Sequence, residues 1–540
     1  MSNFPWLTVT GAIPLAGAIV ISVLPGHSAA GAEADRQARN RLVKIVALIF
    51  SLATLGVSVA MAVQFKTNSS QQFQFSQVYS WIPDFGVHYA VGVDGIALVL
   101  IVMSTVLMPV VVLASWNDAE GATGPIGAAP PQRSVKTYFA LMLVLETMMI
   151  GVFAATDVFL FYVFFEAMLI PMYFMIGSFG VGQRQYAAVK FLLYSLLGGL
   201  LMLVAVIALY VQSIHNGHGG TFLFTSLEHL ALSPTASKWL FLGFFVGFAI
   251  KAPLWPFHTW LPDAAASAQP GAAVLLVGVL DKVGTFGMIR YCLDLFPSAA
   301  HYFTPLVIVL AVIGVLYGAI VAIGQRDLKR LIAYTSVSHM GLMVLGIFVM
   351  TTQGQSGSVL YMVNHGFATG ALFLIAGFMI VRRRSQNIAD YGGVQKVAPV
   401  LAGLFLIAGL AGLSLPGLST FVSEFLVLVG TFTRYEAAAI LATVGIILAA
   451  IYILWMYQRT MTGPVRDEVA SMPDLKAREL WAVGPLIALI IVLGVYPQPV
   501  LKIINPAVNQ TLVQVHSKDP APTAINSGSG QHAFGKELKP

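Results

Sequence analysis

Six ionisable side chains lie inside long apolar segments of this sequence. In chain order they are Glu166, Lys251, Lys282, His339, His365 and Glu424. Each of these side chains can gain or lose a proton when its surroundings change, and the set contains no arginine, which keeps its proton. The set therefore favours proton exchange over anion binding. It also lacks the ring of carboxylates and carbonyls that would suit sodium or calcium.

Burying such groups in a membrane is costly. The two lysines and the glutamates Glu166 and Glu424 would cost about 2.5–3.5 kcal/mol each, or about 10–14 kcal/mol together, before pairing or hydration offsets the cost. A single lysine could instead extend its side chain to the membrane interface, and a single histidine could be a hydrogen-bonded residue of the core. Stability alone does not explain four such charges, so the set indicates a functional role for these residues.

Three more ionisable residues are accessory candidates. Glu146 lies in the apolar segment before that of Glu166, and His258 follows Lys251 by seven residues; we interpret both as structural rather than catalytic. Asp281 is adjacent to Lys282, so the two side chains should leave a helix in different directions and need not pair.

Prolines interrupt two of the apolar segments beside these charges. In IKAPLWPFHTWLPDA, Pro253 and Pro256 follow Lys251, and in LPGLSTFVSEF, Pro416 precedes Glu424. Because proline removes a backbone donor and clashes with the preceding turn, a helix should break at each place. Broken helices beside ionisable residues are typical of ion pathways.

The composition places these segments in a membrane. With 57% hydrophobic residues, 10% charged residues and a mean hydropathy of +0.82, the 540-residue chain is not a soluble protein. We predict an all-α polytopic membrane protein, whose first span is retained because no basic segment precedes it. The fourteen predicted spans are 5–25, 43–64, 93–115, 136–155, 158–178, 188–212, 238–262, 270–293, 302–324, 329–351, 356–381, 398–431, 435–458 and 480–498.

Two groups of five spans share a pattern, because spans four to eight and nine to thirteen each have a broken helix as their fourth member. Five is odd, so the two groups should be inverted repeats. FQFSQVYSWI predicts a short external strand or hairpin, and Asp94 predicts a helix cap. The predicted regions are a three-helix region at 1–134, repeats at 135–295 and 296–460, a C-terminal helix at 461–504 and an extended external tail without a further helix at 505–540.

The basic residues indicate orientation. Of the 29 Lys and Arg residues, 19 fall on the side reached after odd-numbered spans, 8 fall on the other side, and Lys251 and Lys282 lie within the membrane. The positive-inside rule then places both termini outside. Since the basic residues are scattered over short loops, the net charge of +6 does not indicate nucleic-acid binding.

The sequence contains one cysteine, Cys292. A single cysteine excludes an iron–sulfur cluster, a zinc site made of cysteines and an internal disulfide. We therefore expect no redox centre in this chain.

The sequence resembles the antiporter-like, proton-pumping membrane subunits of respiratory complex I, a family shared with multisubunit cation/proton antiporters and membrane-bound hydrogenases. The resemblance covers about residues 90–500 and rests on FFEAMLIPMY, KAPLWPFHTWLPDA, GQRDLKRLIAYTSVSHMG, NHGFATGALF and SLPGLSTFVSEF. The L and N types and the antiporter relatives usually have lysine on the second broken helix, where this chain has Glu424. The L type also has a long lateral helix after its core, and nothing like it follows Tyr496.

The resemblance implies a role for each central residue. Glu166 and Lys251 would form the ion pair of the uptake half-channel, and Lys282 would be the central relay. Protons would then cross the middle of the membrane on His339 and His365 and reach Glu424, the terminal group.

The resemblance also implies the setting of the chain. It would be a proton-translocating subunit of NADH:quinone oxidoreductase in a bacterial plasma membrane, beside L-type and N-type subunits and lipid. It would hold no cofactor, and flavin and iron–sulfur clusters would lie in partner subunits. The alternatives are a subunit of a sodium/proton antiporter or of a membrane-bound hydrogenase, and a purely structural scaffold in which the buried charges are dispensable.

Overall fold

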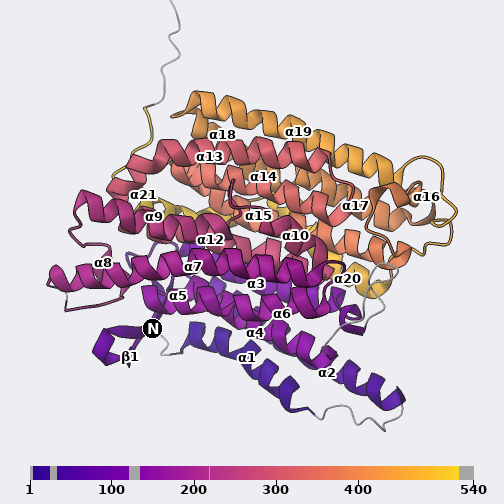
Figure 1. The fold of residues 1–540 in the computed structure, drawn as a ribbon, viewed down its shortest axis with the longest axis horizontal. Coiled ribbons are helices and arrows are strands. Elements are labelled where there is room, and N and C mark those ends of the chain that lie inside the picture. The colour runs from indigo at the N-terminus through magenta and orange to yellow at the C-terminus, as the bar shows by residue number, and fades with distance from the viewer. Residues whose placement is uncertain (1–3, 25–32, 121–133, 218, 522–540) are drawn as a thin grey trace, which may run out of the picture.

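A computed structural model describes residues 4–24, 33–120, 134–217 and 219–521 of the chain. The long helices run side by side, from α1 and α2 at one edge to α19 at the other (Figure 1). Within these residues, twelve helical segments are long and apolar enough to cross a membrane. The two remaining predicted spans, 238–262 and 398–431, are broken helices. The polytopic helical fold is confirmed, and the count of fourteen spans stays a prediction.

The N-terminal region contains three long helices and a hairpin. The predicted strand is confirmed, because β1 and β2 pair antiparallel with Tyr79 opposite Tyr89. The predicted cap is also confirmed, since the Asp94 side chain accepts a hydrogen bond from the Ala97 amide. The elements are α1 (Trp6–Val23), α2 (Glu33–Gln64), β1 (Gln74–Ile82), η1 (Pro83–Phe85), β2 (Val87–Val93), α3 (Gly95–Ala114) and η2 (Asp118–Glu120).

The middle of the chain forms the next set of helices. The span from 270 to 293 is a continuous helix that changes between α-helical and π-helical bonding. The elements are α4 (Val135–Ala154), α5 (Val158–Ala167), α6 (Leu169–Phe179), α7 (Arg184–His215), α8 (Phe224–Leu227), α9 (Pro234–Lys251), α10 (Trp260–Ser267), α11 (Pro270–Leu275), η3 (Leu276–Leu280), α12 (Asp281–Gly287) and η4 (Met288–Leu293).

The C-terminal half packs against the middle set mainly through α14 and α15. Helix α15 packs against α14, α18, α17, α20, α11 and α3. The elements are α13 (Pro297–Ile323), α14 (Leu328–Phe348), α15 (Thr352–Arg383), η5 (Ile388–Asp390), α16 (Val394–Val397), α17 (Pro399–Gly412), α18 (Ser419–Phe432), α19 (Glu436–Met461), α20 (Ala477–Val495) and α21 (Gln498–Gln514).

Helix α21 corrects one prediction. The sequence predicted an extended tail without a further helix from residue 505, because Pro506 and several polar residues obscure the pattern. The buried residues Ile504, Ala507, Val508, Thr511 and Leu512 nevertheless recur at helical spacing. This amphipathic helix packs on α3 and α15, and only residues 522–540 of the predicted tail lie outside the described residues.

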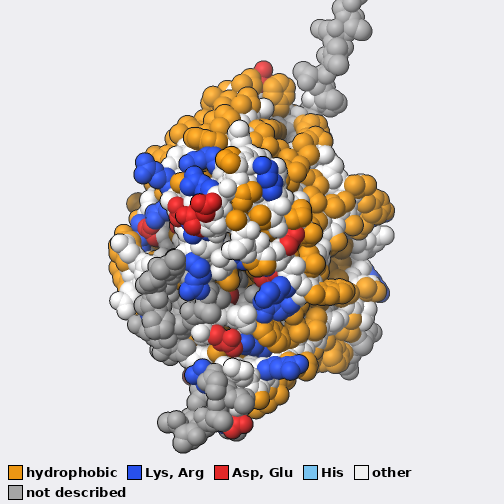
Figure 2. Space-filling view, turned by 90° about the vertical axis from the view of Figure 1, so that its right-hand side faces the viewer, with side chains coloured by type: hydrophobic (Ala, Val, Ile, Leu, Met, Phe, Trp, Pro, Cys, Tyr) orange, Lys and Arg blue, Asp and Glu red, His pale blue; other side chains and the backbone are white. Residues whose placement is uncertain are grey.

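The bundle has two distinct ends. The hairpin end carries β1, α8 and α21, together with the first described residues of the chain (Figure 1). The basic end carries Arg326, Arg330, Arg382–Arg384 and Arg478, and Figure 2 shows Lys and Arg side chains gathered on this end, flanked by apolar surface. Apolar side chains such as Leu193, Leu197 and Val204 are more than half exposed on α7, as expected for a helix that contacts lipid.

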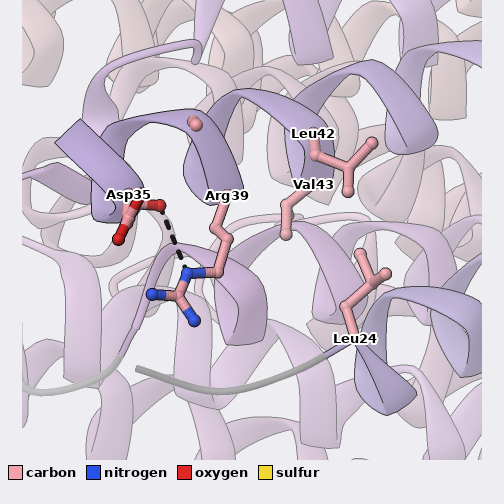
Figure 3. Close-up of a pocket in the computed structure, with 6 residues that line it drawn as sticks. Leu24, Asp35, Arg39, Leu42 and Val43 are labelled. Carbon is pink, nitrogen blue, oxygen red and sulfur yellow. Dashed lines mark hydrogen bonds between the residues drawn. The ribbon is translucent and has the colours of Figure 1, made fainter. Parts of the chain in front are cut away.

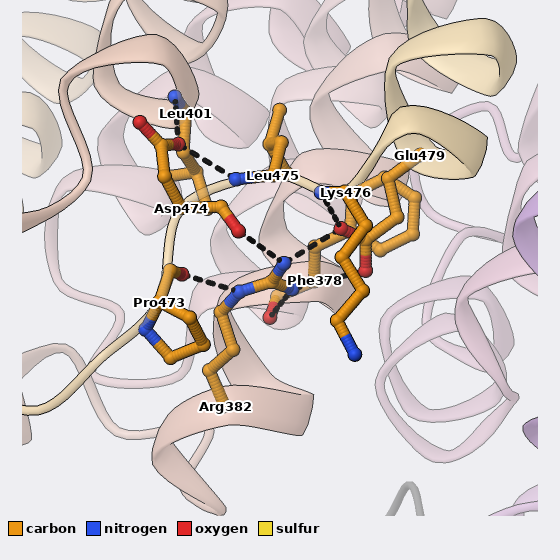
Figure 4. Close-up of polar contacts among 8 residues, drawn as sticks. All are labelled: Phe378, Arg382, Leu401, Pro473, Asp474, Leu475, Lys476 and Glu479. Carbon is orange, nitrogen blue, oxygen red and sulfur yellow. Dashed lines mark hydrogen bonds and ion pairs between the residues drawn. The ribbon is translucent and has the colours of Figure 1, made fainter.

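Two polar features fix helices at the basic end. Arg382, in the last turn of α15, forms a bidentate pair with Glu479 at the start of α20, with an Nη2 to Oε2 distance of 2.6 Å (Figure 4). The Asp474 carboxylate accepts the Leu401 amide in the first turn of α17 (Figure 4). These contacts hold α15 against α17 and α20.

At the edge of the bundle, a groove of about 440 Å³ between α1 and α2 is lined by Leu24, Asp35, Arg39, Leu42 and Val43 (Figure 3).

Candidate functional site

Two helices at the centre of the bundle carry the key groups of the site. The helix from Pro270 to Leu293 and the apolar core of α15 are buried along their whole length. Lys282 and His365, near the middle of these helices, are therefore shielded from lipid by other helices. A charged group can persist here only with polar partners.

Lys282 has three such partners. Its Nζ lies 2.6 Å from His365 Nδ1 and donates to the Val277 carbonyl, 2.5 Å away. Its third contact is with Asp281, where Nζ and Oδ1 are 2.9 Å apart and both side chains are fully buried. The lysine thus links an acid on its own helix to a base on α15.

The contact with Asp281 corrects the expectation that neighbouring side chains need not pair. The long lysine side chain can fold back towards Asp281, the carboxylate that lies beside it in this buried environment. The π-helical segment η3 ends directly before Asp281, and π-helical turns are often found at functional sites.

The chain of polar groups continues from His365 towards the second broken helix. The rings of His365 and His339 are nearly perpendicular, with centroids 5.2 Å apart. His339 Nε2 lies 3.4 Å from the hydroxyl of Tyr452 on α19. The ring of Tyr361, one turn before His365 on α15, is 5.7 Å from that of His339. Sequence reasoning missed both tyrosines.

Glu424 is at the far end of this chain. Its Oε2 accepts hydrogen bonds from Ser414 and from the Tyr361 hydroxyl, the latter at 3.4 Å. The predicted second break is confirmed, since α17 ends at Gly412 and α18 begins at Ser419. Because both of these hydrogen bonds come from hydroxyls and not from backbone amides, Glu424 does not act as the cap of α18.

The first broken helix is also confirmed, because α9 ends at Lys251 and α10 begins at Trp260. The Trp260 indole donates to the Ile250 carbonyl at 2.8 Å and so satisfies one acceptor that the break exposes. Gly284 lets α12 approach this end, because a Cβ there would lie 2.6 Å from the Ala252 amide nitrogen. The Lys251 region therefore contacts the helix that carries Lys282.

Glu166 and Lys251 do not form the ion pair that the resemblance implied. Lys251 Nζ lies 5.0 Å from the centre of the Phe165 ring and has no hydrogen-bond partner among the described residues. Glu166 Oε1 also lacks one, and its carboxylate lies against Gly199, where a Cβ would be 1.7 Å from Oε1. The two charges are close enough to interact electrostatically without direct contact.

Glu166 also lies beside a third interruption, which the sequence analysis did not predict. Helix α5 ends at Ala167 and α6 begins at Leu169. Pro171 explains this interruption, because a proline clashes with the carbonyl four residues before it, here that of Ala167. The interruption is the single residue Met168, two residues after Glu166.

Two of the three accessory residues, Glu146 and His258, lie outside the chain of contacts. Glu146 is fully buried on α4 and His258 is buried in the first break, and the ionisable atoms of both lack hydrogen-bond partners in the described part of the chain. The His258 ring lies edge-on to Tyr317, with centroids 5.0 Å apart. Neither residue joins Lys282 to Glu424, and their interpretation as structural residues stays a prediction.

Residues 155–450 match the family model described as "NADH:quinone oxidoreductase/Mrp antiporter, TM". The chain belongs to this family. NADH-quinone oxidoreductase subunit M of Mycobacterium tuberculosis (strain ATCC 25618 / H37Rv) is 54% identical over 550 residues, which cover 97% of each chain. Subunit M of Rhodobacter capsulatus is 39% identical over 95% of this chain and 97% of its own.

Solved structures of the family agree with this fold. A chain of respiratory complex I from Thermus thermophilus with bound NADH aligns with a TM-score of 0.82 and 29% identity, over 94% of this chain and 99% of that chain. A chain of the Mrp complex from Dietzia sp. DQ12-45-1b aligns with a TM-score of 0.79 and 20% identity, over 95% and 100%. The second likeness concerns the fold alone.

Proposed function

We propose that this chain is the M-type, proton-translocating membrane subunit of an NADH:quinone oxidoreductase. One observation carries the proposal: a series of buried acid–base side chains runs from Asp281 and Lys282 through His365 and His339 towards Glu424. The names of the similar subunits from Mycobacterium tuberculosis and Rhodobacter capsulatus support the choice of enzyme.

The neighbouring groups in this series can pass protons. Lys282 as an ammonium can donate to His365 Nδ1, which faces it at 2.6 Å. The two histidines then offer four ring nitrogens in the space between Lys282 and the tyrosines. Tyr452 and Tyr361 lie close enough to each other and to Glu424 to interact electrostatically, and Glu424 is the last acceptor.

Glu166 and Lys251 supply the uptake half of the pathway in this proposal. Their charges interact across a gap, so movement of either side chain changes how strongly the lysine holds its proton. Redox chemistry on flavin and iron–sulfur clusters of partner subunits drives the movement, and L-type and N-type subunits are the proposed neighbours. The two five-helix units, 135–295 and 296–460, are the proposed inverted repeats.

The test of this function uses the intact membrane complex, isolated through a tag on this chain. We expect NADH-dependent quinone reduction and proton uptake into inverted membrane vesicles that does not require sodium. Lys251→Ala should lose most proton uptake while the complex assembles, because no neighbouring side chain can replace the amine. Lys396→Ala, at the basic end, is the control and should pump normally. Sodium-dependent exchange without quinone reduction would favour the antiporter alternative.

The proposed orientation places the hairpin end outside the cell, and it follows from the distribution of basic residues. A Ser70→Cys variant should react with an impermeant thiol reagent added to intact cells, because Ser70 is exposed beside β1. Ser471→Cys, exposed at the basic end, should react only after the membrane is opened. Cys292 is buried and gives little background. The opposite labelling pattern would reverse the orientation.

A further inference from the structure

A small polar cavity lies at the hairpin end of the helix that carries Lys282. It has a volume of about 20 Å³ and is lined by Asp294, Arg290, Asp94, Glu228, Thr511 and Gln514, among others. A volume of this size is sufficient for one water molecule, which needs roughly 10–15 Å³. Helix α21 lines one side of the cavity, and its Gln514 side chain donates to the backbone carbonyls of Glu228 and Asp294.

Asp294 is the unexplained group in this cavity. Its side chain is 7% exposed, and its Oδ1 has no hydrogen-bond partner in the described ranges. Arg290, one turn earlier, is the nearest cation, but its Nη2 already donates to Asp94 Oδ2 at 2.6 Å. One guanidinium thus serves two carboxyl groups, and the charges of Arg290, Asp94 and Asp294 balance only while Asp294 carries a proton.

Glu228 is the other carboxylate that lines the cavity, and its negative charge further favours the protonated form of Asp294. Glu228 accepts from the Gln72 side chain at 3.1 Å and lies 3.5 Å from the exposed His229. Helix α21 contributes only neutral side chains to the cavity, Thr511 and Gln514 among them. Burial raises the pKa of Asp294 to about 8, and Asp94 and Glu228 act in the same direction, so the carboxyl holds its proton at neutral pH.

We infer that Asp294 is a further proton-exchanging site, which holds one water molecule and releases a proton at the hairpin end. This inference rests on the proposed function and adds to it a release site at the hairpin end. When the Asp294 O–H bond breaks, the proton passes to the cavity water, and the carboxylate that forms is stabilised by Arg290. In the next cycle a proton that has crossed the pathway of the proposed function binds to the carboxylate and restores the neutral carboxyl, so no net charge remains.

The experiment measures proton translocation by the intact complex in inverted vesicles between pH 6 and pH 9, a range that brackets a pKa of about 8. Asp294→Asn should assemble and should reduce the proton yield at least ~10-fold, because an amide cannot carry a transferable proton. The pH dependence of the remaining yield should lack the transition near pH 8 that we expect for the unaltered complex. Asp294→Glu, which keeps an ionisable group, should restore much of the yield and the pH dependence.

Asp84→Asn is the matched control, because Asp84 is exposed in the turn of the hairpin at the same end. It should leave the yield and the pH profile unchanged. An Asp294→Asn variant with normal yield and pH profile would overturn the inference. So would an equal loss of yield at every pH that Asp294→Glu does not rescue, because that pattern indicates a structural role.

A parallel Lys282→Ala variant separates this inference from the proposed function. If Lys282→Ala and Asp294→Asn both pump normally, the proposed function of the chain fails. If Lys282→Ala stops pumping and Asp294→Asn does not, only the assignment of Asp294 fails.

Discussion

Lys282→Arg will stop proton translocation by the complex even though it preserves the positive charge. Guanidinium does not release its proton at any usable pH, so it cannot pass one to His365, which lies 2.6 Å from the lysine Nζ. We expect a loss of at least ~100-fold in the proton translocation rate, the range that proton transfer by a positioned group supplies. The measurement is the NADH-driven pH change in inverted vesicles.

Lys282→Arg is a better test than Lys282→Ala, because the arginine keeps a positive charge beside the buried Asp281. Lys282→Ala should be equally inactive, but it leaves Asp281 buried without its cation, and such an uncompensated charge costs about 3–5 kcal/mol. Lys238→Arg is the control, since Lys238 lies near the hairpin end of α9 and contacts the Tyr302 ring. A Lys282→Arg complex that pumps at the normal rate would show that Lys282 only balances the charge of Asp281.

Glu424→Gln will separate assembly from pumping. Glutamine keeps the size of the side chain and can still accept hydrogen bonds from Ser414 and Tyr361, so the second break should be preserved. It cannot ionise, and we expect quinone reduction coupled to pumping to fall by at least ~10-fold. Quinone reduction and proton translocation are measured on the same vesicles.

Glu424→Asp should retain much of the activity, because aspartate ionises at this position. Its shorter side chain lengthens the contact with the Tyr361 hydroxyl, which is already 3.4 Å away, so some loss is expected. Glu436→Gln, exposed at the start of α19, is the matched control. Normal quinone reduction and proton release in the Glu424→Gln variant would contradict the terminal role and remove the main sequence argument for the M type.

The sequence identified the buried ionisable groups that the fold brings together, because buried charge has few explanations, while their roles in proton transfer stay a prediction. Lys282, His365, His339 and Glu424 were selected by their depth in apolar segments, and the structure places them in a single series of neighbours. The two main breaks were also predictable, because proline in a long helix has a fixed steric consequence. An ionisable residue in an apolar segment predicts a buried charge, and a proline in a long helix predicts a break.

Other parts of the site could not be read from residue types. Tyr361 and Tyr452 look like ordinary core aromatics until the fold brings them beside His339 and Glu424. The pairing of Asp281 with Lys282 depends on how the long lysine side chain folds back along its own helix. The separation of Glu166 from Lys251 depends on where Gly199 leaves space for a carboxylate.

The series from Lys282 to Glu424 also has an electrical consequence. Its members lie near the middle of their helices, so the series runs across the bundle and not along the helix axes. A charge that crosses the whole membrane works against about 2.3 kcal/mol for each 100 mV, but one that moves sideways at constant depth works against almost none. The membrane voltage therefore acts on proton uptake and release, and the lateral transfer between the histidines proceeds at nearly the same rate in energised and de-energised membranes.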